Sequence, residues 1–230
     1  NKMAKITFLI TVFNEAKTVR QAINDIIDFE TPEKEIIIID NGSTDGSQEI
    51  IKEFKNIKSI LRKKNLGNGS TIIEGLKLAK GKYIYVHNSD LEYDYTKSIE
   101  MMSIAEKYNL DVVLGSRVKN KNNIFENLKS NPAFLATYLT TFLINILYKK
   151  KFTDIIGAKL YRVEKLKNIK IDFFHEGFDF GLISRVCKEK YIIDEIAIDY
   201  TPRENFSEKK IKWYHMFVAL FAIFKVKFLN

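Results

Sequence analysis

The chain has 230 residues, of which 46% are hydrophobic and 13% aromatic, so it can bury a sizeable core and is not expected to be disordered. Its formal net charge of +8 comes largely from lysine. Nucleic acid, an anionic membrane surface, phosphorylated substrates or biased codon usage would each account for that charge. The single cysteine, Cys187, excludes an internal disulfide and any site built from several cysteines, and it is interpreted as a small core residue.

The N-terminal residues run directly into the apolar stretch KITFLITVF, without the charged, apolar and small-residue regions of a secretory signal. No window reaches the roughly 18 uncharged apolar residues that a membrane-spanning helix needs. Two segments, 134–148 and 213–229, come near that length, and Lys225 and Lys227 interrupt the second. A cytoplasmic protein is therefore expected.

Strand and helix patterns alternate over the first 115 residues. Short apolar or β-branched runs predict strands at Ile6–Val12, Glu35–Asp40, Tyr83–Val86 and Asp111–Leu114. Helices are predicted at about Thr18–Phe29, Ser47–Phe54, Ser70–Ala79 and Thr96–Tyr108. This alternation predicts an α/β fold with a parallel sheet covered by helices on both faces, and such sheets bind ligands at the carboxyl ends of their strands.

Acidic residues stand at or just beyond the ends of three predicted strands. The first strand is followed by Glu15, the second ends in Asp40 with Asp45 beyond it, and the third is followed by Asp90 and Glu92. Asp45 suits a helix cap. Capping is a weaker account of Asp40, because that residue stands at the very end of an apolar strand.

Beyond residue 115 the pattern changes to a polar loop, a long apolar helix pattern and then mixed structure. No internal repeat and no clean linker is recognisable. The second half is therefore expected to continue the same domain to about residue 210, with residues 211–230 as a C-terminal amphipathic helix appended to it.

Five segments of the first half form an ordered set of motifs: TVFNE (11–15), IIIIDNGSTDGS (36–47), RKKNLGNGSTIIEGLKLAKGKYI (62–84), NSDLEYD (88–94) and GSR (115–117). Their order, spacing and strand context resemble the inverting nucleotide-sugar glycosyltransferases of family 2. The resemblance implies the GT-A fold, which is a Rossmann-like, mostly parallel central sheet with helices on both faces. Residues 1–115 would then be the nucleotide-sugar-binding half and 116–210 the acceptor half.

Three later segments narrow the resemblance: FTDIIGAKLYR (152–162), EGFDF (176–180) and DYTPRENFSEKKIKWYHMF (199–217). They look like the dolichyl- or polyprenyl-phosphate sugar synthases and their soluble bacterial relatives. The chain departs from that group in one respect, because the group usually has a further acid after EGFDF, near the start of the following helix. Here the chain reads Gly181, Leu182 and Ile183.

The resemblance implies a divalent cation, Mg²⁺ or Mn²⁺, on the pyrophosphate of the donor, where it offsets the charge of the leaving group. The family holds this metal with an acid-x-acid motif, which here reads Asn88-Ser89-Asp90. Asp90 is the implied metal ligand and catalytic residue, with Glu92 as a second ligand, because magnesium typically takes one or two protein carboxylates. Asn88 removes one negative charge and is expected to weaken metal binding in the absence of substrate.

The donor-binding residues implied by the resemblance are Thr11, Glu15, Asp40, Lys63, Gly67, Asn88, Ser89 and Asp90. Asp40 would face the base or the ribose. Gly67 belongs to a turn into a helix that brings backbone amides close to an anion. Lys63, or its neighbour Arg62, would contact the pyrophosphate, although a solvated lysine patch explains this pair of residues equally well.

The acceptor phosphate would be bound by Arg117, Lys129, Ser130 and Arg203. Arginine suits this role because its planar fork meets two phosphate oxygens at once. A phosphate acceptor is already anionic and needs positioning more than a general base. Asp154 is the candidate base if one exists, and a structural loop residue is an equally good interpretation.

We therefore expect an inverting, metal-dependent transfer of a sugar from a nucleotide-diphosphate donor to a polyprenyl phosphate, at the inner face of the cytoplasmic membrane. The lysine-flanked apolar segments 134–151 and 213–227 would lie peripherally on that membrane, unless they are core helices or dimer helices of a homo-oligomer. Two alternatives remain open: transfer to a hydroxyl of a surface polysaccharide or lipid-linked glycan, and a non-catalytic nucleotide-sugar-binding protein. Nucleic acid is not expected, because the lysines are not interleaved with stacking aromatics.

Overall fold

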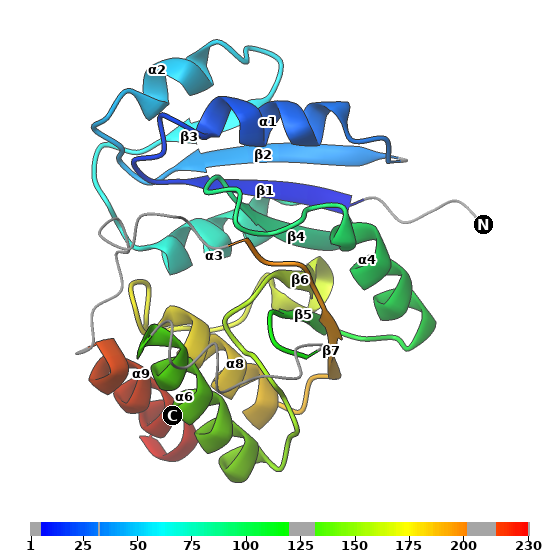
Figure 1. Ribbon diagram of the computed structural model, residues 1–230, viewed down its shortest axis with the longest axis vertical. Helices are drawn as coiled ribbons and strands as arrows, with labels where there is room; N and C mark the ends of the chain where they lie inside the picture. Colours follow the sequence, from blue (N-terminus) through cyan, green and yellow to red (C-terminus); the bar gives the residue numbers. More distant parts are fainter. Residues whose placement is uncertain (1–5, 32, 120–131, 202–214, 230) are drawn as a thin grey trace.

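A mostly parallel sheet of seven strands runs through the centre of the protein (Figure 1). The structure is a computed structural model that describes residues 6–31, 33–119, 132–201 and 215–229. The strands are β1 (Ile6–Val12), β2 (Lys34–Asp40), β3 (Lys58–Leu61), β4 (Tyr83–Asn88), β5 (Val112–Ser116), β6 (Lys159–Arg162) and β7 (Ile193–Ala197). They lie in the order β3-β2-β1-β4-β6-β5-β7, and of these described strands only β6 runs antiparallel to its neighbours.

The four predicted strands are all present, with ends within two residues of the prediction. The sequence interpretation missed β3, a strand of 4 residues at the edge of the sheet in which Lys58 and Ser59 are exposed. The acidic segment around Asp90 therefore follows the fourth strand and not the third. The prediction of a mostly parallel sheet is confirmed, and the antiparallel strand is β6 from the second half, which inserts between β4 and β5.

Helices cover both faces of the sheet, as predicted. On one face pack α1 (Val19–Asp28), α2 (Ser47–Lys52) and α4 (Lys97–Lys107). On the other pack α3 (Asn68–Leu78), α6 (Pro132–Tyr148), α7 (Val163–Leu166), α8 (Phe178–Lys188) and α9 (His215–Phe224). The central strands are apolar on both sides, since Ile37 and Ile39 enter one core and Ile38 the other. Each such side chain, fully buried, stabilises the fold by about 1.5–3 kcal/mol.

The C-terminal helix, expected as an appendage, packs against α6 and α8 at the end of the molecule opposite α1 and α2 (Figure 1). This C-terminal helix consists of α9 followed directly by a π-helical segment, η2 (Lys225–Leu229). One side is buried through Ala222, Ile223 and Val226, whereas Phe221 on the other side is 59% exposed. Within the described residues, no helix has the length and apolar character needed to span a bilayer.

Candidate functional site

Three predicted donor-site residues meet at the carboxyl edge of neighbouring strands. In the register of the sheet Val12 of β1 lies beside Asp40 of β2, and Thr11 of β1 lies beside Asn88 of β4. The ends of β2, β1 and β4 therefore bring Thr11, Asp40 and Asn88 to one edge, as the strand-end pattern predicted.

Asp40 is completely buried, and within the described part of the chain one of its two carboxylate oxygens is hydrogen-bonded. Its Oδ1 accepts hydrogen bonds from the backbone N–H groups of Gly42 (3.0 Å) and Ser43 (2.9 Å) and from the Gln48 side chain (2.6 Å). Its Oδ2 is buried and accepts no hydrogen bond from any residue that the structure describes. A buried acceptor in that state is energetically unfavourable, so the oxygen suits a donor supplied by a ligand. Sequence reasoning missed Gln48, which is indistinguishable from an ordinary surface residue of a short helix.

The loops after β1 and β2 are fastened to each other. Three backbone N–H groups of the first loop donate to side chains of the second: Asn14 to Ser43 (2.8 Å), Glu15 to Ser47 (3.0 Å) and Ala16 to Asp45 (2.9 Å). Asp45 shapes this junction, and although its partial burial opposes ionisation, hydrogen bonds from Ser47 and Ala16 lower the pKa of its carboxyl. Glu15 is half-buried in the same junction, close to the edge that carries Asp40.

The segment after β4 is anchored to β1 by polar contacts. The Thr11 hydroxyl donates to Oδ1 of Asn88 at 2.9 Å, and the Ser89 hydroxyl donates to the carbonyl oxygen of Thr11 at 2.9 Å. Oδ1 of Asp90 accepts the backbone N–H of Glu92 at 3.2 Å. The amide oxygen of Asn88 thus accepts from Thr11. The loop carries three carboxylates, Asp90, Glu92 and Asp94, and the last of them accepts from the backbone N–H and the hydroxyl of Thr96.

The same loop contains Leu91 in a left-handed backbone conformation, with φ of 60°. Non-glycine residues adopt it rarely, and such strain tends to gather at functional sites. Among the described residues, no group of three His, Cys, Asp or Glu side chains could hold a metal ion on its own. Asp90 and Glu92 supply two carboxylates, which is the number that magnesium typically takes from a protein when phosphates and water provide its remaining ligands.

The glycine-bearing turn before α3 is fixed by the protein itself. Gly67 has φ of +86°, and a Cβ added there would lie 1.9 Å from the carbonyl oxygen of Phe174. The Arg62 guanidinium is nearly buried and is bound to Glu74 at 2.5 Å, so it stabilises the turn. Lys63, by contrast, is exposed.

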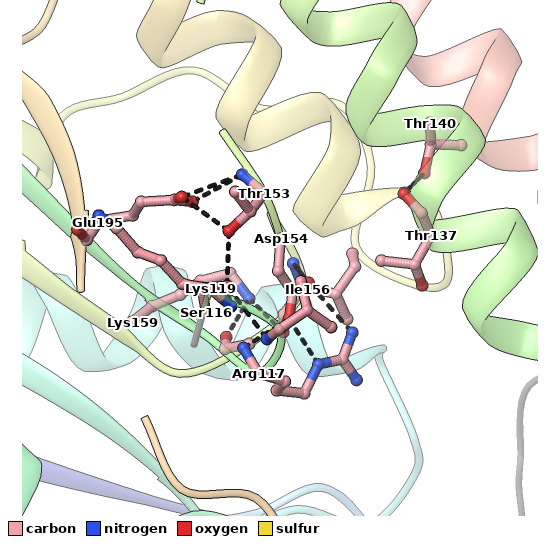
Figure 2. A network of polar contacts seen from close by, with 12 residues as sticks. Ser116, Arg117, Lys119, Thr137, Thr140, Thr153, Asp154, Ile156, Lys159 and Glu195 are labelled. Carbon is pink, nitrogen blue, oxygen red and sulfur yellow. Dashed lines mark hydrogen bonds and ion pairs between the residues drawn. The ribbon is translucent and has the colours of Figure 1, made fainter. Parts of the chain in front are cut away.

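On the acceptor side, Arg117 and Asp154 form a buried ion pair (Figure 2). Their side chains expose only 10% and 2% of their surface. Asp154 accepts from Nε of Arg117 at 2.6 Å and Nη2 at 3.1 Å, and from the backbone N–H groups of Arg117 and Ile156. Burial alone would raise the pKa of the Asp154 carboxyl, but the charge and hydrogen bonds of Arg117 hold it below its usual value. A carboxylate so engaged is a poor proton acceptor.

A second network next to this pair was not predicted (Figure 2). Glu195 of β7 is 6% exposed, and its carboxylate accepts the backbone N–H of Thr153 at 2.9 and 3.0 Å and the Thr153 hydroxyl at 2.7 Å. The same hydroxyl lies 2.6 Å from that of Ser116 at the end of β5. The motifs that contain Arg117 and Asp154 are thereby fixed to each other. Its sequence context gave no signal that Glu195 is buried, because the exposed Asp194 stands beside it in the same short strand.

The other predicted acceptor residues, Lys129, Ser130 and Arg203, lie outside the described residues and stay predictions. The departure after EGFDF has a structural counterpart. A Cβ at Gly181 would approach the Phe173 ring to 2.8 Å, and Leu182 and Ile183 are fully buried. Positions 181–183 of α8 are therefore packed as core, where an unpaired carboxylate would be strongly disfavoured.

Comparisons with known proteins agree with this geometry. The model of a family described as "Glycosyl transferase family 2" matches residues 7–170. A poly-beta-1,6-N-acetyl-D-glucosamine synthase of Staphylococcus epidermidis is 34% identical over 130 residues, which are 54% of this chain and 32% of that protein. An uncharacterized protein of Methanocaldococcus jannaschii is 27% identical over 206 residues, covering 84% of this chain and 87% of its own.

Among solved structures, glucosyl-3-phosphoglycerate synthase of Mycobacterium tuberculosis, in complex with Mn²⁺, uridine diphosphate and phosphoglyceric acid, superposes with a TM-score of 0.74. The match covers 98% of this chain and 79% of that one at 14% identity, which shows the shared GT-A fold. The chain spans about a third of the length of the curated synthase from Staphylococcus epidermidis. Because the family model extends over more than half of the chain, the protein belongs to glycosyl transferase family 2.

Proposed function

We propose that the protein transfers a sugar, with inversion, from a nucleoside-diphosphate donor to a polyprenyl phosphate. The observation that carries the donor half is Asp40, whose Oδ2 is buried at the strand edge and accepts no hydrogen bond from the described residues. A nucleobase N–H or a ribose hydroxyl would supply the missing donor. Asn88, Thr11, Ser89, Glu15, Lys63 and Gly67 would complete the donor site around it.

Asp90 and Glu92 would hold Mg²⁺ or Mn²⁺ against the donor pyrophosphate. The bound ion would offset the negative charge of the leaving nucleoside diphosphate. Asn88 is assigned to the donor site, where its amide oxygen accepts from Thr11. The Mycobacterium tuberculosis structure contains Mn²⁺ and uridine diphosphate, which supports a divalent cation in this fold.

The acceptor half of the proposal is supported by the Arg117–Asp154 pair. Asp154 is held ionised with its oxygens engaged, so we assign it to orienting Arg117 and not to proton transfer. Arg117 would then be presented to an acceptor phosphate, which is anionic and requires no base. Transfer to a glycan hydroxyl is the second candidate, and the sequence similarity to a polysaccharide synthase favours it.

The exposed apolar faces of α6 and α9 support a peripheral position on an anionic membrane. Phe142 and Ile146 of α6 are 53% and 60% exposed, and Phe217 and Phe221 of α9 are 58% and 59% exposed. Lysines 149–151 follow α6 directly, which suits anionic lipid at the same surface. Co-sedimentation with vesicles of phosphatidylglycerol should exceed that with phosphatidylcholine, and binding to neither would refute the membrane position.

The donor assignment is tested by binding and transfer with a panel of nucleotide sugars, Mn²⁺ and a polyprenyl phosphate. Asp40→Asn places an N–H donor where the ligand must donate, so nucleotide affinity should fall about tenfold or more. Asp90→Ala should abolish metal-dependent transfer. Glu49→Gln, at a side chain that is 70% exposed, is the matched control and should leave both unchanged. Full transfer by Asp90→Ala would exclude the metal role.

The chemical nature of the labelled product shows which of the two acceptor classes the enzyme uses. Labelled lipid that is cleaved by mild acid indicates a sugar attached to a polyprenyl phosphate. The hydroxyl acceptor would instead be established by two results together. The enzyme would transfer sugar to a glycan acceptor and not to the lipid, and Asp154→Asn would lose turnover while keeping its stability, which would identify Asp154 as the base.

A further inference from the structure

The loop after β4 and the segment that follows β7 are joined by an isolated antiparallel β-bridge. Tyr93 pairs with Tyr200 there, and the backbone N–H of Thr201 donates to the carbonyl oxygen of Glu92 at 3.0 Å. The proposed metal-binding loop and the acceptor half of the molecule are therefore joined by backbone contacts at this point.

The Tyr200 side chain makes contact with both halves. Its ring lies against the Arg117 guanidinium, with 5.3 Å between the guanidinium carbon and the ring centroid. Its hydroxyl is hydrogen-bonded to the Glu92 carboxylate. A tyrosine hydroxyl is protonated at neutral pH, so it can donate to that carboxylate.

Tyr93 completes the contact. Its ring centroid lies 5.6 Å from that of Tyr200, with the two planes inclined by 37°. Burial raises the pKa of the Tyr93 hydroxyl. The charge of Arg117 lowers this pKa, and the charges of Asp154 and Asp90 raise it. Tyr93 thus packs, with a tilted ring, against the tyrosine that contacts both the proposed metal loop and the proposed phosphate-binding arginine.

We propose that Tyr200 is a positioning residue that couples the two half-sites, with its hydroxyl orienting Glu92 and its ring orienting Arg117. The inference rests on the proposed function, in which Glu92 serves the metal and Arg117 the acceptor phosphate. A tyrosine suits the task because a rigid ring with a polar tip can serve a charged group at each end. Holding donor and acceptor in a fixed relation lowers the barrier of transfer even when no base is required.

Two substitutions separate the two roles of the side chain. Tyr200→Phe removes the hydrogen bond to Glu92 and keeps the ring against Arg117. Because loss of a partner that orients a metal ligand typically weakens metal binding 10- to 100-fold, the Mn²⁺ concentration for half-maximal rate should rise about tenfold, with the acceptor KM unchanged. Tyr200→Leu also removes the ring, so both the Mn²⁺ constant and the acceptor KM should rise.

Two further variants test whether the effect is specific. Tyr191→Phe removes a hydroxyl that donates to the carbonyl oxygen of Lys165 away from the site, and it should change neither constant. In a Glu92→Gln background, Tyr200→Phe should have little additional effect on the Mn²⁺ constant, since the two act through one contact. Calorimetric titration of Mn²⁺ in the presence of the donor's nucleoside diphosphate gives the same constant without turnover.

The outcomes distinguish a failure of the Tyr200 coupling from a failure of the proposed function. If the wild type transfers sugar with Mn²⁺ and both Tyr200 variants merely lower stability while leaving the Mn²⁺ constant and acceptor KM unaltered, Tyr200 is only a packing residue and the coupling is wrong. If the wild type neither binds Mn²⁺ with a nucleoside diphosphate nor transfers sugar, the proposed function fails and the coupling fails with it.

Discussion

Asp154 binds Arg117 through two parallel hydrogen bonds, at 2.6 Å to Nε and 3.1 Å to Nη2, in a place where both side chains are almost fully buried. Sequence reasoning had assigned the two residues separate roles, one to a base and one to the acceptor phosphate. The pairing makes them one unit in which the carboxylate fixes the plane of the guanidinium. Such geometry gives directional recognition of a second anion more readily than proton transfer.

Removal of one partner of this pair should be strongly destabilising. Asp154→Ala leaves the Arg117 charge buried without its counterion, and the free energy of unfolding should fall by about 3–5 kcal/mol in urea denaturation. The double variant Arg117→Met, Asp154→Leu should be milder than the single one, because it leaves no uncompensated charge. Glu53→Ala breaks the exposed pair with Arg20 and is expected to have little effect. Equal losses for Asp154→Ala and Glu53→Ala would contradict the buried pair.

The fold could be predicted in large part because its central strands are long and apolar. The run Ile36–Ile39 enters both cores, so its pattern is that of a buried parallel strand. Two of the strands that escaped prediction, β6 and β7, are short and carry polar residues with specific partners. In β6, Lys159 is 6% exposed and pairs with Asp179 of α8, and β7 contains the buried Glu195. Their polarity depends on distant partners that a local pattern does not contain.

Some residues of the candidate site could likewise be predicted from the sequence, and others could not. Positions at strand ends, such as Asp40 and Asp90, follow from the alternation of strands and helices together with the family resemblance. Contacts such as Glu195 with Thr153, or Tyr200 with Arg117, join segments far apart in the sequence. They depend on how β5, β6 and β7 lie against one another, and the sequence pattern alone carries no information about that arrangement.

Gly67 should tolerate no side chain. It combines a positive φ with a carbonyl oxygen 1.9 Å from where a Cβ would stand, so Gly67→Ala should reduce the free energy of unfolding by about 3 kcal/mol or more. Gly46 has a similar φ of +96° but nothing within 4 Å, and Gly46→Ala should cost only about 1 kcal/mol. Urea midpoints of the two variants check the difference, and similar midpoints would mean that the turn does not pack on Phe174.

The buried histidine of β4 should make stability depend on pH. His87 is 2% exposed, and burial lowers the pKa of its imidazole to about 4 from an ordinary value near 6.5. Between pH 6.5 and pH 4 the unfolded chain therefore binds the proton more readily than the folded one, and stability falls as the pH falls through that window. The loss attributable to His87 is about 3 kcal/mol at most.

The measurement is urea denaturation of the wild type and His87→Phe at intervals from pH 7.5 to pH 4. The variant lacks the titrating group, so the difference in unfolding free energy between the two proteins should shift in its favour as the pH falls, by an amount of the order of 3 kcal/mol. Above pH 7 the difference should be constant. A difference that does not vary with pH would show that His87 is accessible to protons in the folded state.

Glu195 should influence the acceptor without touching it. Glu195→Gln replaces one of the two oxygens that receive the N–H and hydroxyl of Thr153, and the free energy of unfolding should fall by about 1 kcal/mol. Because Thr153 precedes Asp154, the loosened segment should also misorient Arg117 and raise the acceptor KM several-fold, on the order of a 1 kcal/mol effect, while the donor KM stays unchanged. Glu189→Gln, an exposed change on the loop before β7, is the control. A donor KM that rises in parallel would mean that Glu195 supports the whole sheet edge and not the acceptor side.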